Sequence, residues 1–117
     1  IQLNLALSYS SRSEIFNAVK DFANDYKNGT LNEADFSEDL FESYLLTKGI
    51  PDPDLLIRTS GEQRISNFLL WQIAYTELYF TEAHWPAFTK EEFFKAIYTY
   101  QSRERRFGLT SEQLSKS

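Results

Sequence analysis

The sequence has no cysteine, no methionine and a single histidine, His84, and only four glycines and three prolines occur among its 117 residues. Without cysteine, the chain offers no disulfide framework, no thiolate metal site and no cysteine nucleophile. A single histidine argues against a Ser-His-Asp catalytic triad and against a metal site with several imidazole ligands. Any chemistry of the chain must therefore come from other side chains.

Basic residues are the minority among the charged ones: 12 Lys and Arg stand against 17 Asp and Glu, which gives a net charge of −5. This balance argues against general affinity for nucleic acid, because no basic field attracts phosphates over the whole surface. An anion site must therefore be local. No apolar run approaches the roughly 20 residues that a membrane-spanning helix needs. The 42% hydrophobic and 16% aromatic content suits one folded domain.

The order of the expected elements favours an α/β fold, with a parallel sheet covered by helices. Hydrophobic periodicity and capping residues predict, in chain order, a strand over residues 1–9, a helix capped by Ser11 and ending near Gly29, a helix from Ser37 to Gly49, a strand over 55–57, a helix over 66–75 capped by Ser66, and a helix from Thr89 to Gly108. Residues 77–81 suit either a short strand or an irregular segment. Because a domain rarely opens on a strand at residue 1, we expect this chain to be the C-terminal part of a longer protein.

Two of the expected strands end in the same way, with hydroxyl side chains beside an arginine. Ser10-Ser11-Arg12 follows the first strand, and Arg58-Thr59-Ser60 follows the second. Ligands of open parallel sheets bind at the carboxyl ends of the strands. Helix N-termini and the planar fork of arginine both suit phosphate oxygens.

Arg58, Arg64 and Ser66, gathered around a turn that contains Gly61, therefore predict a diphosphate clamp. The alternative is that Arg58 pairs with Glu62 and that the serines only cap helices.

Acidic residues near the clamp could hold a metal ion together with the phosphate. Mg²⁺ is usually bound by one or two carboxylates and by phosphate oxygens. Glu62 and Glu77 are the carboxylates closest to the clamp in sequence, although such a residue is more often simply solvated. His84, between Ala83 and Trp85, fits a packing or surface position better than a catalytic one.

Residues 54–88, DLLIRTSGEQRISNFLLWQIAYTELYFTEAHWPAF, resemble the last signature region of the cis-prenyltransferases, the family of the undecaprenyl diphosphate synthases. LNLALSYSSRSEI resembles the region that precedes it, and RERRFG resembles the C-terminal Arg-x-Gly element of the family. The resemblance covers residues 2–108. It implies that residues 1–108 are the C-terminal half of a cis-prenyltransferase domain and that 109–117 form a flexible tail.

The resemblance implies an enzyme that condenses isopentenyl diphosphate onto an allylic diphosphate, usually farnesyl diphosphate, with each new double bond in cis. The expected product is undecaprenyl diphosphate, the precursor of the lipid carrier for cell-wall synthesis. By motif, the clamp would bind the diphosphate of isopentenyl diphosphate, Glu77 would bind Mg²⁺, and Arg106 and Gly108 would reach the isopentenyl site across the interface of a homodimer. The enzyme is expected in the cytoplasm, or peripherally at the inner face of the membrane.

Part of the family pattern is absent from the sequence. No Gly-Asn-Gly occurs, so the essential aspartate of that motif is expected upstream, and this chain supplies no catalytic residue of its own. The family often has the sequence Tyr-Gly-Gly-Arg at a turn where this chain has Tyr9-Ser10-Ser11-Arg12. We expect this turn to border the site. The 117 residues alone are therefore expected to be inactive.

Two other functions compete with the catalytic one. The chain could belong to a non-catalytic subunit of a heteromeric cis-prenyltransferase, which donates its C-terminus to a partner. The intact clamp favours the catalytic kind, because a subunit that only donates its C-terminus has no need of it. A generic phosphate-binding α/β module would require the long motif match to be accidental.

Overall fold

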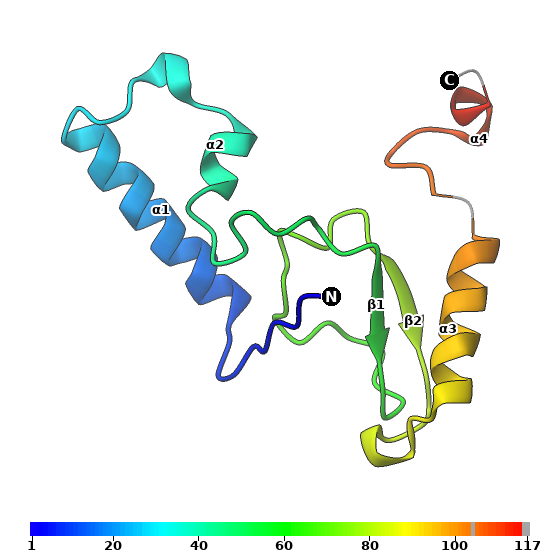
Figure 1. The fold of residues 1–117 in the computed structure, drawn as a ribbon. Coiled ribbons are helices and arrows are strands. Elements are labelled where there is room, and N and C mark those ends of the chain that lie inside the picture. The colour runs from blue at the N-terminus through cyan, green and yellow to red at the C-terminus, as the bar shows by residue number, and fades with distance from the viewer. Residues whose placement is uncertain (104, 116–117) are drawn as a thin grey trace. The chain divides into compact units, whose positions relative to one another are not determined.

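The computed structural model describes residues 1–103 and 105–115 of the chain (Figure 1). The chain divides into two compact units. The first comprises Ile1–Asp52 and Ser66–Trp71, and the second comprises Pro53–Ile65 and Gln72–Ser117. None of the helices in the described residues is long and apolar enough to cross a membrane.

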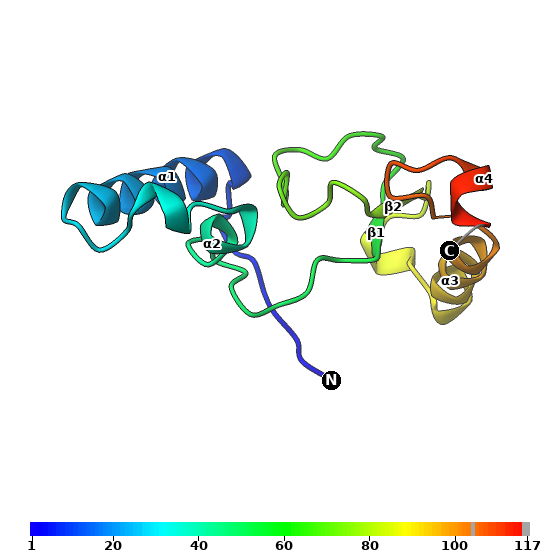
Figure 2. The same cartoon turned by 90° about the horizontal axis from the view of Figure 1, so that it is seen from above.

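The first unit is built on two helices, α1 (Ser11–Lys27) and α2 (Glu38–Glu42), with a short 3₁₀ turn, η1 (Glu33–Asp35), between them. Figures 1 and 2 show α1 beside the segment that carries α2. The ring of Phe22 on α1 packs against Phe36, Phe41 and Tyr44, with centroid separations of 4.8 to 6.2 Å. This aromatic cluster is what joins the two helices.

Residues 1–9 do not form the predicted strand. The segment is irregular, and its alternating side chains Leu3, Leu5 and Leu7 are largely exposed. Alternation produces a strand only where a neighbouring strand supplies backbone hydrogen bonds. Among the described residues, none hydrogen-bonds to residues 1–9 in that way.

The ends of the two helices differ in part from the predictions. Ser10, not Ser11, is the N-cap of α1, because Ser10 is extended and its hydroxyl accepts a hydrogen bond from the Ser13 N–H at 3.3 Å. The expected stop near Gly29 is confirmed, with φ of 79° at that glycine. Ser37 caps α2 as predicted, but α2 ends at Glu42, and turns rather than helix continue to Gly49.

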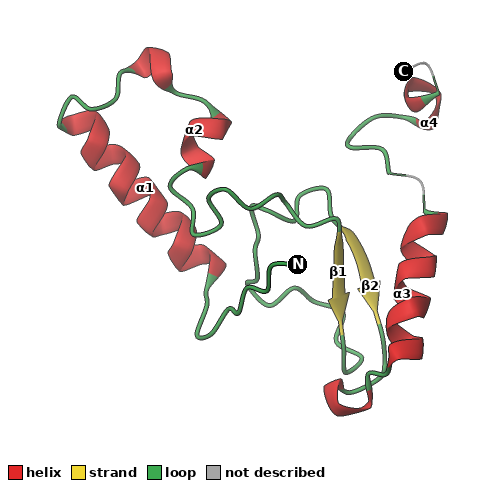
Figure 3. Ribbon diagram, in the orientation of Figure 1, coloured by secondary structure: helices red, strands yellow, loops and turns green. Residues whose placement is uncertain are grey.

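The second unit contains a parallel pair of strands, β1 (Leu55–Arg58) and β2 (Glu77–Phe80), shown in yellow in Figure 3. In their register Leu55 lies opposite Glu77, and Arg58 lies opposite Phe80. The parallel pairing confirms the predicted α/β class, and residues 77–81 prove to contain a strand. In open parallel sheets ligands bind where the strands end, so a ligand is expected at the ends of β1 and β2.

Helices follow the sheet in the second unit. A 3₁₀ turn, η2 (Trp85–Ala87), leads to α3 (Lys90–Ser102), which lies beside β2. Thr89 caps α3 as predicted, since its hydroxyl accepts a hydrogen bond from the Glu92 N–H at 3.3 Å. A short helix, α4 (Ser111–Leu114), lies within the predicted tail. Residues 104, 116 and 117 lie outside the described residues. Residue 104 belongs to the RERRFG stretch, and residues 116 and 117 belong to the predicted tail.

Two predicted helical stretches are wrong. Residues 66–75 contain no helix, because Ser66, Asn67 and Leu69 have φ of 53°, 62° and 49°, a left-handed backbone that ends helical winding. The last long helix stops at Ser102, six residues before the predicted Gly108, because Arg103 is extended with ψ of 144°.

Asn67 explains why the first of these stretches is not helical. Its carbonyl oxygen accepts from the Ser11 N–H at 2.9 Å, and its side-chain oxygen accepts from the Arg12 N–H at 2.9 Å. Its amide also donates to the Ser10 hydroxyl at 2.8 Å. Asn67 thus satisfies N–H groups that the start of α1 leaves open, and these tertiary contacts outweigh the apolar periodicity of its segment.

Glu14, in the first turn of α1, is a buried carboxylate. Its side chain is 5% exposed and lies within the first unit. It accepts a hydrogen bond from the Tyr9 hydroxyl and another from the Leu46 N–H at 2.7 Å. Burial, and then the hydrogen bond to Glu14, raises the pKa of Tyr9, so the phenol remains a donor. Glu14 therefore links Tyr9, which precedes α1, to Leu46, which follows α2.

Replacing Glu14 by alanine is expected to lower the free energy of unfolding by about 2 to 3 kcal/mol, because a buried N–H and a hydroxyl lose a charged acceptor. Glu14→Gln keeps one acceptor oxygen and should cost less than half as much. Urea denaturation of the two variants measures the difference. Equal stability of Glu14→Ala and the unsubstituted protein would contradict a structural role for this carboxylate.

Candidate functional site

Hydrogen bonds join the loops that follow β1 and β2. We call this end of the sheet the carboxyl edge, and it comprises Arg58–Gly61 and Thr81–His84. The Arg58 carbonyl accepts a hydrogen bond from the Thr81 N–H at 2.9 Å. The Ser60 N–H donates to the Ala83 carbonyl at 2.9 Å, and the Gly61 N–H donates to the Thr81 carbonyl at 2.9 Å. These bonds hold the carboxyl edge in one conformation.

The turn at the carboxyl edge is left-handed at two successive residues, one of which is a glycine. Ser60 and Gly61 both have left-handed φ, of 66° and 68°. A Cβ atom on Gly61 would lie 2.5 Å from Oε2 of Glu82, so any larger residue would displace that carboxylate. The Gly-containing turn expected between the two arginines is therefore present, and it is compact.

Arg58 and Arg64 have different surroundings. Arg58 is half-buried at the last position of β1, and no carboxylate among the described residues pairs with its guanidinium. Arg64 pairs with Glu62, so Glu62 engages this arginine rather than Arg58. The Arg64 side chain is 68% exposed, and an ion pair so open to water contributes little stability. Both guanidiniums are therefore open to an anionic ligand, Arg64 by exchange of its partner.

His84 and Ser60 form a contact that the sequence did not reveal. The His84 Nδ1 lies 3.2 Å from the Ser60 hydroxyl, and His84 is exposed. The signal that could have found this pair is topological, because residues that follow two parallel neighbours meet at one edge. That signal needed β2, which periodicity alone left undecided.

Ser66 and the turn Ser10-Ser11-Arg12 belong to the first unit, whereas Arg58 and Arg64 belong to the second. Ser66 is exposed, and Asn67 beside it makes the hydrogen bonds to the start of α1. Ser11 is buried, and its hydroxyl accepts from the Leu70 N–H at 2.8 Å. The role of Ser66 in the clamp stays a prediction.

Glu77 lies at the amino edge of the sheet, the end where both strands begin. Its Oε2 accepts a hydrogen bond from Arg103 Nη1 at 3.4 Å. Because Glu77 is level with Leu55, it is separated from Arg58 by three residues of strand, roughly 10 Å. Within one chain, Glu77 and Arg58 thus face opposite edges.

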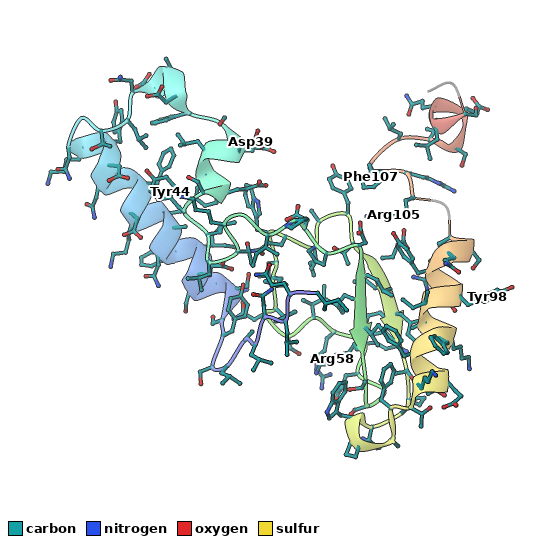
Figure 4. All side chains as sticks on the ribbon, in the orientation of Figure 1. Asp39, Tyr44, Arg58, Tyr98, Arg105 and Phe107 are labelled. Carbon is teal, nitrogen blue, oxygen red and sulfur yellow. The ribbon has the colours of Figure 1, made fainter. Side chains whose placement is uncertain are left out.

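Arg106 and Gly108 also lie toward the amino edge. The preceding residue, Arg105, donates to Asp54 Oδ1 at 2.7 Å, directly before β1 begins. A Cβ on Gly108 would lie 3.8 Å from the hydroxyl of Tyr75. Tyr75 lies two residues before the start of β2. Figure 4 shows Arg58 at the arrowhead end of β1 and Arg105 with Phe107 near the opposite end.

Glu77 does not form a metal centre by itself in this arrangement. No cluster of three or more His, Cys, Asp or Glu side chains within the described part of the chain could hold a metal ion. Glu77 is already engaged by Arg103, and it does not share an edge with Arg58. The residues present therefore do not fit a complete Mg²⁺ site, and the metal role of Glu77 stays a prediction.

A prenyltransferase family model, described as undecaprenyl diphosphate synthase, matches residues 1–108. The chain is 59% identical over 113 residues to an isoprenyl transferase of Geobacter sulfurreducens, covering 97% of this chain and 46% of that protein. It is 53% identical over 116 residues to a ditrans,polycis-undecaprenyl-diphosphate synthase ((2E,6E)-farnesyl-diphosphate specific) of Coxiella burnetii, covering 99% and 49%. The chain thus spans about half the length of these relatives.

A solved structure shares the fold. The crystal structure of lavandulyl diphosphate synthase from Lavandula x intermedia, in complex with dimethylallyl diphosphate, superposes with a TM-score of 0.84 at 42% sequence identity. The match covers 89% of this chain and 45% of that one. The fold of this chain is therefore similar to that of a crystal structure that contains a bound diphosphate.

Proposed function

The chain belongs to the cis-prenyltransferase family, and from this premise we propose that the enzyme containing it condenses isopentenyl diphosphate with an allylic diphosphate. The observation that carries this proposal is Arg58, whose guanidinium stands at the carboxyl edge of a parallel sheet without a carboxylate partner among the described residues. Arg64 follows it after a compact turn, in an exposed pair that a ligand can replace.

Arg58 and Arg64 bind the diphosphate of the isopentenyl unit in this proposal. Arginine forks fix the orientation of a diphosphate through paired hydrogen bonds. Holding that group fixes the double bond of the same molecule beside the allylic carbon, which converts an encounter into an oriented reaction. The double bond attacks that carbon while the allylic diphosphate leaves, and the new unit then loses a proton. Mg²⁺ is the proposed cofactor of the whole enzyme, where it would neutralise charge on the diphosphates.

The separation of the two edges supports a homodimer. Arg106 and Gly108 lie toward the amino edge, and Arg58 stands at the carboxyl edge of the same sheet. The Arg-x-Gly element would therefore serve the isopentenyl site of a second subunit rather than that of its own chain. A non-catalytic subunit that only donates this element would have no use for a ligand-ready Arg58.

Farnesyl diphosphate is the proposed allylic substrate, and undecaprenyl diphosphate the proposed product. The name of the Coxiella burnetii relative states both. The product would be a membrane lipid that serves as a carrier precursor in cell-wall synthesis. We place the enzyme in the cytoplasm, or at the inner face of the membrane, where such a product would be handed over.

Labelled isopentenyl diphosphate, incubated with the full-length protein and either farnesyl or dimethylallyl diphosphate, tests the proposal. We expect label in a long-chain lipid with farnesyl diphosphate, with cis double bonds in the added units by NMR. Mass spectrometry of the product gives the chain length. Absence of label in any prenyl product with both allylic partners would refute cis-prenyltransferase activity.

A further inference from the structure

We propose that Arg105 is a positioning residue that fastens the Arg106–Gly108 segment to the amino edge of the sheet. Arg105 Nη1 donates to Asp54 Oδ1 at 2.7 Å and to the Tyr100 hydroxyl at 3.3 Å. Its Nη2 donates to the Tyr75 carbonyl at 3.0 Å. One side chain thus joins the start of β1, the segment before β2 and the end of α3. The inference rests on the proposed function, in which Arg106 and Gly108 contact a diphosphate.

Arg105 also packs against the segment that it would hold. Its guanidinium lies over the Phe107 ring, 4.5 Å from the centroid, and over the Tyr100 ring at 5.8 Å. The rings of Phe107 and Tyr75 are 5.8 Å apart. A planar guanidinium can stack on rings and donate hydrogen bonds in its plane at the same time, which an ammonium cannot do.

The segment after Arg105 is a tight turn whose conformation depends on where it is held. The Leu109 N–H donates to the Arg106 carbonyl at 2.8 Å, and Phe107 and Gly108 between them have φ of 50° and 84°. The position of such a turn is set by the side chains that its residues contact. Arg105 supplies such a side chain, and Phe107 is the part of the turn that it touches.

Arg105 and the neighbouring Arg106 differ in the exposure of their side chains. The Arg105 side chain is 20% exposed, whereas Arg106 is exposed. The hydrogen bond with Asp54 raises the pKa of Arg105, so its charge is maintained at every working pH. The Arg105 side chain is thus engaged within its own chain by Asp54, Tyr100 and Tyr75.

Steady-state kinetics of the full-length enzyme test the inference. Arg105→Ala is expected to raise KM for isopentenyl diphosphate about tenfold, the usual cost of losing a hydrogen bond to a charged group, with kcat changed less than twofold. Asp54→Asn removes only the charge of an exposed partner and should raise the same KM about threefold. Arg105→Lys should resemble Arg105→Ala more than the parent, because lysine lacks the fork. Lys95→Ala, on exposed α3, is the matched control and should change neither constant.

The decisive measurement repeats Arg105→Ala in an Arg106→Ala background. Because Arg105 acts through the segment that carries Arg106, its substitution should raise KM clearly less in this background than in the parent. Full additivity, or an unchanged KM in Arg105→Ala while Arg106→Ala raises it, would overturn the inference and leave the proposed function standing. An unchanged KM in Arg106→Ala alone would instead overturn the assignment of Arg106 to the isopentenyl site.

Discussion

Replacing Arg58 by alanine in the full-length enzyme should raise KM for isopentenyl diphosphate by roughly 30- to 150-fold, equivalent to about 2 to 3 kcal/mol for a lost charged hydrogen-bonding partner. Arg58 is half-buried at the last position of β1, where the strand fixes its backbone at the carboxyl edge. The affinity for the allylic diphosphate should change little, because the proposal assigns Arg58 to the isopentenyl diphosphate alone. Steady-state kinetics with each substrate varied in turn separate the two constants.

Arg64→Ala should act in the same direction with a smaller effect. Arg64 is largely exposed and must first release Glu62 before it can bind a ligand, which reduces its net contribution. Glu62→Gln provides a matched test of this point, since it weakens the competing pair and should leave KM unchanged or lower it. If Arg58→Ala and Arg64→Ala both bind isopentenyl diphosphate as tightly as the parent, these two arginines do not form the clamp.

Local signals in the sequence predicted the parts of the fold that depend on neighbours in the chain. Ser37 and Thr89 cap their helices because a hydroxyl can reach the N–H three residues on whatever lies elsewhere. The stop of α1 near Gly29 is equally local. The strand over residues 55–57 was found because its apolar run is bounded by prolines and by a polar turn, and β1 extends it by one residue.

Predictions failed where distant residues decide the conformation. Residues 66–75 carry a helical apolar period, yet Asn67 reaches the start of α1 and holds a left-handed backbone there. No periodicity encodes that contact, because its partners are separated by 55 residues. The strand over residues 1–9 failed for the related reason that pairing requires a second strand in place.

The candidate site divides along the same line. The sequence identified the arginines at the end of β1 and the glycine between them, since these follow one strand directly. It did not show that Glu77 pairs with Arg103, nor that His84 contacts Ser60, because both contacts depend on the register of β2. That register also sets Glu77 and Arg58 at opposite edges of the sheet.

The 117 residues alone should incorporate no labelled isopentenyl diphosphate above background. Parallel sheets are normally buried on both faces and usually contain more than two strands. The sheet of this chain has two strands of four residues each. Few large side chains are buried: among the described residues the apolar core consists of Ala18, Leu45, Ile73 and Ala96. The proposed clamp would supply one diphosphate site, and condensation needs two.

Scintillation counting of extracted lipid, with the full-length enzyme assayed in parallel, measures this loss of turnover. Circular dichroism of the isolated chain separates a folded but inactive polypeptide from an unfolded one. NMR titration with inorganic diphosphate then shows whether a folded chain still binds at the carboxyl edge, with Arg58→Ala as its control. Turnover by the isolated chain would contradict the prediction, since it would require this half to bind both substrates and to carry the catalytic group that we expect upstream.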